Sequence, residues 1–240
     1  MKRSILVSAS FFLASGVALA GRSPGADFPI YDNGGRPDLT IDPKRFESQI
    51  EIVDRVFDAE HDQCALAEGA IGGYGVRRLL RFDTVIMNSG DGDLVVGRRD
   101  DPDNPYAPYF YFAGCHGHYH IRDFSVHELL SADGSLVVAG FKQGFCFEDS
   151  FKYGSGRSNG YNCDFQGITS GWGDWYYKQL VGQWIDITGV PAGDYRLRVR
   201  INAGADGNGL FPEGENRYPN SVEVTLHVPS PRHKVATATD

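Results

Sequence analysis

The sequence predicts an all-β fold, a single β-sandwich-like domain with long loops and little helix. One observation is the presence of segments in which apolar and polar residues alternate, such as 50–57. Another is a composition of 30 glycines and 12 prolines with 12% aromatic residues, which is typical of strands joined by tight turns. The third is the segment 131–134, Ser-Ala-Asp-Gly, which lies between two apolar runs and is a strong hairpin signal.

In chain order, the pattern predicts strands at 37–43, 50–57, 78–86, 93–97, 109–112, 124–130, 136–147, 183–188, 194–202 and 221–228. Residues 64–73 are mostly small, and we expect no more than one helical turn there. We expect loops at 100–108, 148–173 and 203–219, where Gly, Pro, Ser, Asn and Asp are frequent. We find no internal repeat and expect one domain.

The segment Gly114–His120 carries a histidine at every second position: His116, His118 and His120. In an extended strand these side chains share one face, so three imidazoles can meet at one metal ion. Imidazole suits copper, zinc, iron and nickel, and three nitrogens leave positions open for water, oxygen or substrate. The outer two Cα atoms of an ideal strand would be about 13 Å apart, so we expect a twist or bulge at Gly117. Three ordinary surface histidines are the alternative.

The expected hairpin connects this segment to a lysine. If Asp133 and Gly134 form a two-residue loop, the two residue numbers in each cross-strand pair add up to 267. Lys142 then lies opposite Ser125. Because 124–130 follows the histidines directly, the hairpin would bring Lys142 toward them. A single bulge would reverse the face that Lys142 occupies.

Both ends of the chain are expected to lie outside the folded domain. Residues 1–20 have a basic start, an apolar run and a final Ala-Leu-Ala, the pattern of a secretory signal peptide rather than a membrane span. We expect a flexible segment at 21–36, the domain at 37–228 and a mobile tail at 229–240. The mature protein would be secreted or periplasmic, with no membrane span. It would hold 21 basic and 31 acidic residues, a formal net charge of −10, which argues against nucleic acid as a partner and favours cationic ligands.

The chain has four cysteines, Cys64, Cys115, Cys146 and Cys163. An even count in an exported protein predicts two disulfides. Four cysteines allow three pairings, and composition does not choose among them.

Several short motifs together resemble the lysyl oxidase family. The segment Cys115–His120 resembles the family's copper-binding motif, and Phe124–Leu130, Lys142–Asp149 and Gln183–Tyr195 resemble further family segments in the same order and at similar spacing. The resemblance covers about residues 37–228 and implies a microbial, secreted member with a lysyl oxidase-like catalytic domain. The implied activity is copper-dependent oxidative deamination of primary amines, in peptidyl lysine or small molecules, to aldehydes. Molecular oxygen would be consumed, and ammonia and hydrogen peroxide released.

The resemblance also implies two cofactors. Copper(II) would be held by the three histidines, and lysine tyrosylquinone would form as a crosslink between Lys142 and Tyr176, with Tyr177 as the second candidate. Such a quinone is needed because unmodified side chains do not readily accept two electrons from an amine. Trp172 and Gly182 replace family cysteines around this tyrosine, so vertebrate-type bridging of the loop is missing.

Disulfides and a second ion follow from the same resemblance. The implied pairs are Cys64–Cys115 and Cys146–Cys163. The segments 37–39 and 212–220 resemble a calcium site, whose oxygen ligands would come from Asp38, Leu39, Glu213, Glu215 and Asn220. Arg217 and Ser221 stand where the family offers further oxygen ligands, and an acidic loop without an ion is the alternative.

Asp123, three residues beyond His120, is the expected base that removes the α-proton of the bound amine. A structural carboxylate paired with Arg122 or another cation is the alternative. Two other classes of function remain open. A zinc hydrolase could use the three histidines, although no H-E-x-x-H motif accompanies them. An exported, non-enzymatic copper-binding protein would need the histidines but neither Lys142 nor Tyr176.

Overall fold

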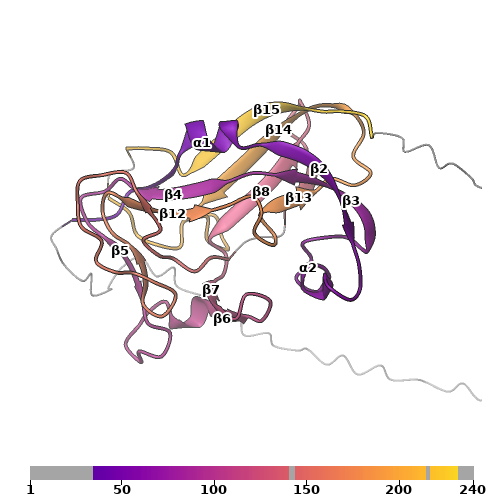
Figure 1. The fold of residues 1–240 in the computed structure, drawn as a ribbon. Coiled ribbons are helices and arrows are strands. Elements are labelled where there is room, and N and C mark those ends of the chain that lie inside the picture. Colours follow the sequence, from indigo (N-terminus) through magenta and orange to yellow (C-terminus); the bar gives the residue numbers. More distant parts are fainter. Residues whose placement is uncertain (1–34, 141–143, 215–216, 232–240) are drawn as a thin grey trace, which may run out of the picture.

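The computed structural model describes residues 35–140, 144–214 and 217–231. Its strands form antiparallel sheets, so the expected all-β fold is confirmed (Figure 1). One four-stranded sheet has the order β1 (Leu39–Ile41), β4 (Thr84–Asn88), β12 (Trp172–Tyr176), β10 (Phe151–Lys152), and the other β15 (Ser221–Val228), β14 (Gly193–Ile201), β8 (Ser125–Leu130), β9 (Leu136–Ala139).

Three smaller sheets are also formed by the described residues. The first has the order β13 (Trp184–Asp186), β3 (Gly75–Arg81), β2 (Glu51–Phe57). The second pairs β11 (Gln166–Ile168) with β5 (Leu94–Gly97), and the third pairs β6 (Phe110–Ala113) with β7 (His118–Ile121). The helical elements are α1 (Pro43–Ser48), α2 (Gln63–Ala67) and the 3-10 turn η1 (Ala107–Tyr109). No helix within the described part of the chain is long and apolar enough to span a bilayer.

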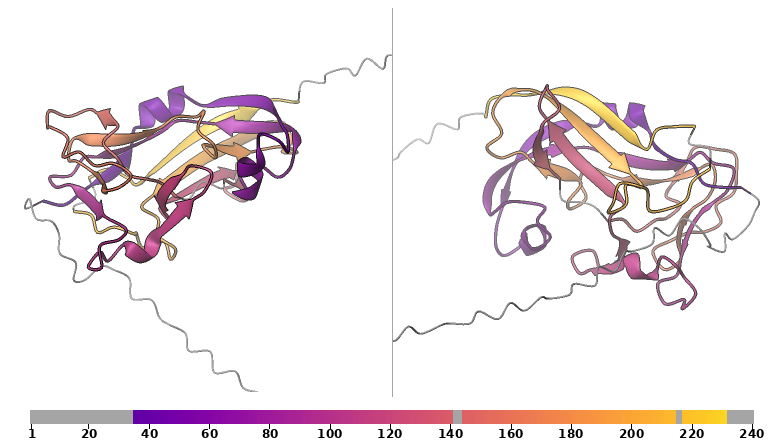
Figure 2. Two further views of the ribbon diagram at one scale, coloured as in Figure 1. Left: turned by 60° about the horizontal axis from the view of Figure 1, so that its bottom comes forward. Right: turned by 180° about the vertical axis from the view of Figure 1, so that it is seen from behind.

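One hydrophobic core joins the two four-stranded sheets. It contains Leu39 and Ile86 from β1 and β4, and Leu197 and Val199 from β14, all with essentially no exposed surface. The alternation along β14 explains this, because successive side chains of a strand point to opposite faces. Figure 2 shows the β8–β14–β15 layer from behind, lying across the strands that run in front of it in Figure 1. This packing agrees with the predicted sandwich.

A second core lies under α2. Phe57, Ile71, Leu79 and Trp184 are buried there, and the Trp184 indole donates a hydrogen bond to the Ala70 carbonyl at 2.8 Å. This cluster attaches α2 to the β2–β3–β13 sheet. Packing therefore fixes the position of α2 on this sheet.

The expected strand at 78–86 is two strands in the structure. The chain leaves β3 after Arg81 and enters β4 at Thr84, and these strands belong to different sheets. Asp83 at the crossing is buried and accepts hydrogen bonds from the Trp175 indole at 2.8 Å and the Lys178 amide at 2.9 Å. Long-range partners thus interrupt a run that looks continuous in sequence.

Other differences concern short elements. The expected loop at 148–173 contains β10, β11 and the start of β12, and α1 follows the expected first strand. The Asp42 side chain caps α1 by accepting from the Lys44 and Arg45 amides at 3.1 Å, with Pro43 at the first turn. Strands of two or three residues are too short to show an alternating pattern in the sequence. They are recognised only by their hydrogen bonds to neighbouring strands.

The register of the hairpin at Ser131–Gly134 is as predicted over part of its length. Glu128 pairs with Ala139 and Leu129 with Val138, both in agreement with the sum of 267. The loop is longer than two residues, since the Ser131 amide bonds to the Ser135 carbonyl at 2.9 Å, and a shift between Leu129 and Leu130 absorbs the difference. The expected strand 136–147 ends early, at Ala139. Lys142 lies outside the described residues, as do the expected signal peptide and most of the expected tail.

Candidate metal centre and tyrosine site

The three histidines lie on the β6–β7 hairpin, which is at the bottom of Figure 1. His118 and His120 alternate along β7, whereas His116 lies in the turn that connects the two strands. The His116 and Gly117 amides both bond to the Ala113 carbonyl at 2.9 Å, and Gly117 has a φ of 73°. The expectation of one extended strand for all three histidines is therefore wrong, while the expected irregularity at Gly117 is present. Glycine adopts this left-handed conformation without strain, and the turn folds His116 back beside the other two.

The three imidazole rings converge. The Nε2 atoms of His118 and His120 are 2.9 Å apart, and the ring centroids are separated by 4.8 to 5.9 Å. Two nitrogens bound at about 2.0–2.1 Å to one ion are about 2.9 Å apart in a tetragonal site, where they meet at right angles, and about 3.3 Å apart in a tetrahedral one. The same separation suits an N–H···N hydrogen bond between neutral rings. His120 is buried and the other two are partly exposed, so the residues fit a metal ion that is open to solvent.

Two polar side chains contact these rings from outside. The Tyr111 hydroxyl lies 3.4 Å from Nδ1 of His120, and its ring meets the imidazole edge-on at 5.7 Å between centroids. A Glu68 carboxylate oxygen lies 3.4 Å from Nε2 of His116. Burial raises the pKa of Tyr111, and the negative charge of Glu68 adds to this effect, so the hydroxyl keeps its proton at neutral pH.

Both expected disulfides, Cys64–Cys115 and Cys146–Cys163, are present, each with its Cα atoms 5.3 Å apart. The first joins α2 to the residue before His116. The sulfurs of the second lie within 4.8 Å of a ring nitrogen of His118. Because bonded sulfurs carry no thiolate, this grouping is structural rather than a metal site. Each disulfide thus holds a different segment of the chain against the histidines.

Tyr176 lies on β12, whose neighbours in the sheet are β4 and β10. Its hydroxyl is buried and donates to the Cys146 carbonyl at 2.5 Å and to the Asp174 carboxylate. The Phe145 ring meets its own ring edge-on at 4.3 Å. Burial, followed by the negative charge of Asp174, raises the pKa of Tyr176 well above its usual value. Tyr177, the second candidate, is 46% exposed and packs on Trp175, so it points away from this pocket.

Asp174 is buried beside Tyr176 on the same face of β12. Its carboxylate accepts from the Ser150 hydroxyl at 2.7 Å and the Glu148 amide at 3.2 Å in addition to Tyr176. Burial nevertheless raises the pKa of Asp174 to about 7. The pair therefore shares a hydrogen-bonded proton in a site without direct access to solvent.

Asp123, the expected base, lies between β7 and β8 with a φ of 61°. Its backbone carbonyl accepts from the Gly204 amide at 3.0 Å. Its carboxylate is near enough to contribute to the raised pKa of Tyr111, while the Arg122 guanidinium lies over the Tyr111 ring at 5.8 Å. Asp123 is thus on the Tyr111 side of the histidines, in a left-handed conformation that is uncommon for non-glycine residues.

The expected calcium ligands that the structure describes lie together. Glu213 accepts from the Leu39 amide and from the Asn220 side-chain amide, each at 2.6 Å, and burial raises its pKa. Within the described residues, Oδ1 of Asp38 and Oδ1 of Asn220 are buried without a hydrogen-bond donor. Buried oxygen acceptors without donors suit a hard cation.

Arg217, at a position where the family offers an oxygen, does not place its charge in this cluster. Its amide donates to Asp38 at 3.1 Å, and its guanidinium pairs with Asp91 at 3.1 Å. Glu215, another expected ligand, lies outside the described residues.

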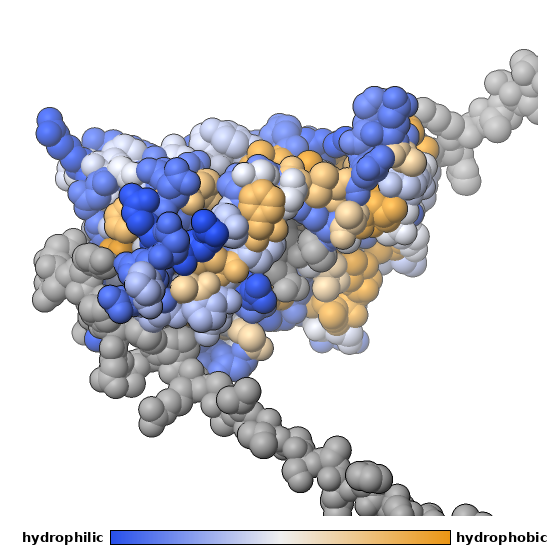
Figure 3. Space-filling model, turned by 90° about the horizontal axis from the view of Figure 1, so that it is seen from below, coloured by the Kyte–Doolittle hydropathy of each residue, from blue (hydrophilic) through white to orange (hydrophobic). Residues whose placement is uncertain are grey.

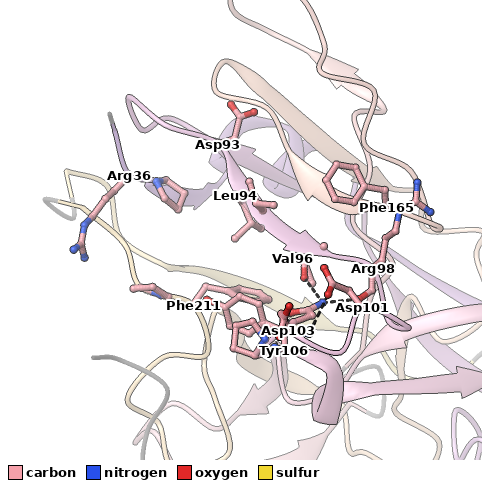
Figure 4. A pocket seen from close by; sticks show the side chains of 16 residues that line it. Arg36, Asp93, Leu94, Val96, Arg98, Asp101, Asp103, Tyr106, Phe165 and Phe211 are labelled. Atoms are coloured by element: carbon pink, nitrogen blue, oxygen red, sulfur yellow. Dashed lines mark hydrogen bonds between the residues drawn. The ribbon is translucent and has the colours of Figure 1, made fainter. Parts of the chain in front are cut away.

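A cavity of about 350 Å³ opens elsewhere, between β5 and the segment that precedes β6 (Figure 4). Apolar side chains, including Leu94, Val96 and Phe211, form much of its wall, and Asp101 and Asp103 lie near Tyr106 in the close view. None of the three histidines lines this cavity. The β6–β7 hairpin lies toward the face seen from below. That face carries hydrophilic and apolar side chains side by side (Figure 3).

Glu68, Tyr111 and Asp174 were not singled out by sequence reasoning. Glu68 is one helical turn beyond Cys64, so the Cys64–Cys115 disulfide could have placed it near His116. Asp174 is two residues before Tyr176, a spacing that puts both on one face of a strand. Tyr111 offered no signal, because only the β6–β7 register sets it opposite His120.

Comparison with known proteins agrees with these observations. Residues 49–219 match the lysyl oxidase family. The chain is 33% identical to lysyl oxidase homolog 2 of Gallus gallus over 90% of its length, and 34% identical to that of Homo sapiens over 78%. It is 37% identical to lysyl oxidase homolog 3B of Danio rerio over 69%. The alignments span 30%, 24% and 21% of those longer proteins. The match over most of the chain, together with the converging histidines, shows that this protein belongs to the lysyl oxidase family.

Proposed function

We propose that this protein is an exported copper-dependent amine oxidase that converts primary amines to aldehydes. The observation that carries the proposal is the 2.9 Å separation of the His118 and His120 Nε2 atoms, with His116 folded beside them. This donor set suits copper. Copper and a quinone formed from Lys142 and Tyr176 would supply the two-electron oxidation and the reaction with oxygen.

The residues of the chain would divide the remaining tasks. The three histidines would hold the ion, and the β12 strand would hold the Tyr176 ring at a fixed position in the core. Asp174 and the Cys146 carbonyl would orient its hydroxyl. Asp123 would accept the α-proton of the substrate. The acidic balance of the chain suits cationic substrates, either peptidyl lysine or small amines such as polyamines.

The test uses purified protein loaded with copper in air. We expect a visible quinone band that reacts with phenylhydrazine, and peroxide release that depends on a primary amine. Lys142→Ala should retain copper but lose the band, whereas Lys44→Ala, at an exposed position in α1, should retain both. Wild-type activity in Lys142→Ala would refute the proposed crosslink. A peptide map should contain one crosslinked pair from the segments of Lys142 and Tyr176.

A non-enzymatic copper-binding protein is the second candidate. The observation that favours it is the engagement of the Tyr176 hydroxyl with Asp174 and Cys146 in a buried pocket. A colourless copper-loaded protein that releases no peroxide with any primary amine would support it. Hydrolysis that depends on zinc would instead support the zinc hydrolase.

We also propose a calcium ion bound by Asp38, Leu39, Glu213, Glu215 and Asn220. It would satisfy the buried Oδ1 atoms of Asp38 and Asn220. Calcium at about 100 times its Kd should raise the free energy of unfolding by roughly 2.7 kcal/mol. Chemical denaturation with and without calcium measures this, and Asp38→Asn should remove most of the increment. Magnesium is the control ion, because its octahedral preference suits this site less well.

A further inference from the structure

The contacts around the histidine cluster (His116, His118 and His120) differ from ring to ring. His118 and His120 present their Nε2 atoms to each other at 2.9 Å. His116 presents its Nε2 atom to the Glu68 carboxylate at 3.4 Å. Nε2 of His116 therefore faces a carboxylate, whereas Nε2 of His118 and Nε2 of His120 face another imidazole.

The fold brings the Glu68 backbone close to the start of the histidine segment. The Glu68 amide bonds to the Cys64 carbonyl at 2.9 Å, one helical turn away. Cys64 is joined to Cys115, the residue before His116. Both ends of the contact are thus connected through a short covalent path, and Ala65 in α2 is buried in the second core.

A carboxylate at Nε2 has a chemical consequence for the ring. Its negative charge favours a proton on the nearer ring nitrogen, and so the tautomer in which the proton is on Nε2 and the lone pair is on Nδ1. His120 has the opposite arrangement, because the Tyr111 hydroxyl lies 3.4 Å from its Nδ1 and leaves Nε2 directed at His118.

Tyr111 is also held in place. It is the direct partner of His120 in the β6–β7 ladder. A side chain at Gly144 would meet the Tyr111 ring and hydroxyl, so only glycine fits there without a shift of one of the two. The backbone at Gly144 therefore lies against the Tyr111 side chain.

We propose that Glu68 and Tyr111 are positioning residues of the histidine cluster: Glu68 directs His116 to bind the metal through Nδ1, and Tyr111 directs His120 to bind through Nε2. The proposal rests on the metal site of the proposed function and adds the identity of the binding nitrogens. Neither residue needs to touch the metal or the substrate. Outer contacts of this kind commonly change metal affinity by about 10- to 100-fold.

Zinc(II) is the probe, because it is diamagnetic and permits NMR of bound histidines. In ¹⁵N-histidine-labelled, zinc-loaded protein, long-range ¹H–¹⁵N spectra should show His116 bound through Nδ1 with a proton on Nε2. His118 and His120 should be bound through Nε2. Binding of His116 through Nε2 would overturn the proposal, even if the protein proves to be an amine oxidase.

Zinc and copper affinities give the second readout. Glu68→Ala should weaken metal binding by about 10- to 100-fold. Glu68→Gln keeps an acceptor oxygen and should lose less metal affinity than Glu68→Ala. Glu60→Ala is the matched control, an exposed glutamate on the approach to α2. Tyr111→Phe should weaken binding only a few-fold, because the Tyr111 hydroxyl is a neutral group whereas the Glu68 carboxylate is charged. Its control is Tyr119→Phe, since Tyr119 points to the other face of β7 and its hydroxyl accepts from Arg99 at 3.0 Å.

The outcomes separate this proposal from the proposed function. If Glu68→Ala and Glu60→Ala bind zinc with the same affinity within twofold, the positioning role is refuted while the metal site stands. Wild-type protein that binds neither zinc nor copper would refute both. If the nitrogen pattern is as expected and no amine is oxidised, the positioning role stands and the enzyme proposal fails. Unfolding curves of each variant check that the fold is retained.

Discussion

The histidine cluster and the Tyr176 site differ in how firmly the protein holds them. The histidines lie on a two-stranded hairpin at the edge of the fold, and His116 and His118 are partly exposed. Tyr176 lies inside a four-stranded sheet, with its hydroxyl bonded to Asp174 and Cys146. Removal of a histidine ligand should therefore affect metal binding with little effect on folding, whereas changes at Tyr176 should affect stability.

The difference also shows what the proposed chemistry requires. A tyrosine that forms a crosslink has to give up or share its present hydroxyl contacts. Burial raises the pKa of Tyr176, so its hydroxyl does not ionise by itself at neutral pH. Asp174, with a pKa raised to about 7, is a neighbouring group able to receive that proton. The histidine cluster lies nearer to the proposed bound state, since the 2.9 Å between two of its nitrogens suits a shared ion as well as a hydrogen bond between the rings.

The largest effect is expected at Asp174. Its pKa of about 7 in the folded protein exceeds the unfolded value near 3.8, so the folded state binds the proton more tightly. This stabilisation is complete below the unfolded pKa and is lost as the pH rises through about 7. Asp174→Asn keeps a neutral side chain and should match wild type near pH 4. It should exceed wild-type stability above pH 8, by up to roughly 4 kcal/mol.

Urea unfolding of both proteins between pH 4 and pH 9 measures this difference. Asp164→Asn, at a position outside the buried pair, is the control and should show no such divergence. If the free energies of unfolding of wild type and Asp174→Asn change in parallel with pH, the Asp174 carboxyl is solvated. The Tyr176 site is then not the buried region described here.

The next effect is expected at the metal site. His118→Ala should weaken copper binding at least about 100-fold, which corresponds to roughly 2.8 kcal/mol of binding free energy. The metal-free variant should unfold within about 0.5 kcal/mol of wild type, because His118 is partly exposed at the edge of the fold. Isothermal titration calorimetry measures the copper affinity, and urea unfolding measures the free energy of unfolding. His227→Ala is the control, since that ring pairs with the exposed Asp194 on a distant sheet.

A smaller effect is expected for the tyrosine itself. Tyr176→Phe keeps the ring contact with Phe145 but removes the hydroxyl that donates to Asp174 and Cys146. Loss of a donor to buried acceptors should cost about 1–3 kcal/mol of stability. Tyr177→Phe, at an exposed position, should stay within about 0.5 kcal/mol. Equal stabilities of the two variants in denaturant would show that the Tyr176 hydroxyl is not held as described.

Local pattern predicted much of the framework but not its long-range connections. The alternation at 50–57 and the hairpin signal at Ser131–Gly134 lead directly to β2 and to the β8–β9 register. The break at Asp83 escaped prediction, because its partners Trp175 and Lys178 are about 90 residues away in the chain. The turn position of His116 escaped it as well, since an H-x-H-x-H pattern is equally compatible with a continuous strand.

The sequence by itself determined the residue types of the site: three alternating histidines with a glycine between the first two, and two pairs of cysteines placed by family resemblance. Only the tertiary structure decided which groups meet them, namely Glu68 at His116, Tyr111 at His120 and Asp174 at Tyr176. The physical reason is that spacing along a strand or helix sets the face of a side chain, while its partner comes from whichever segment the core packs against that face.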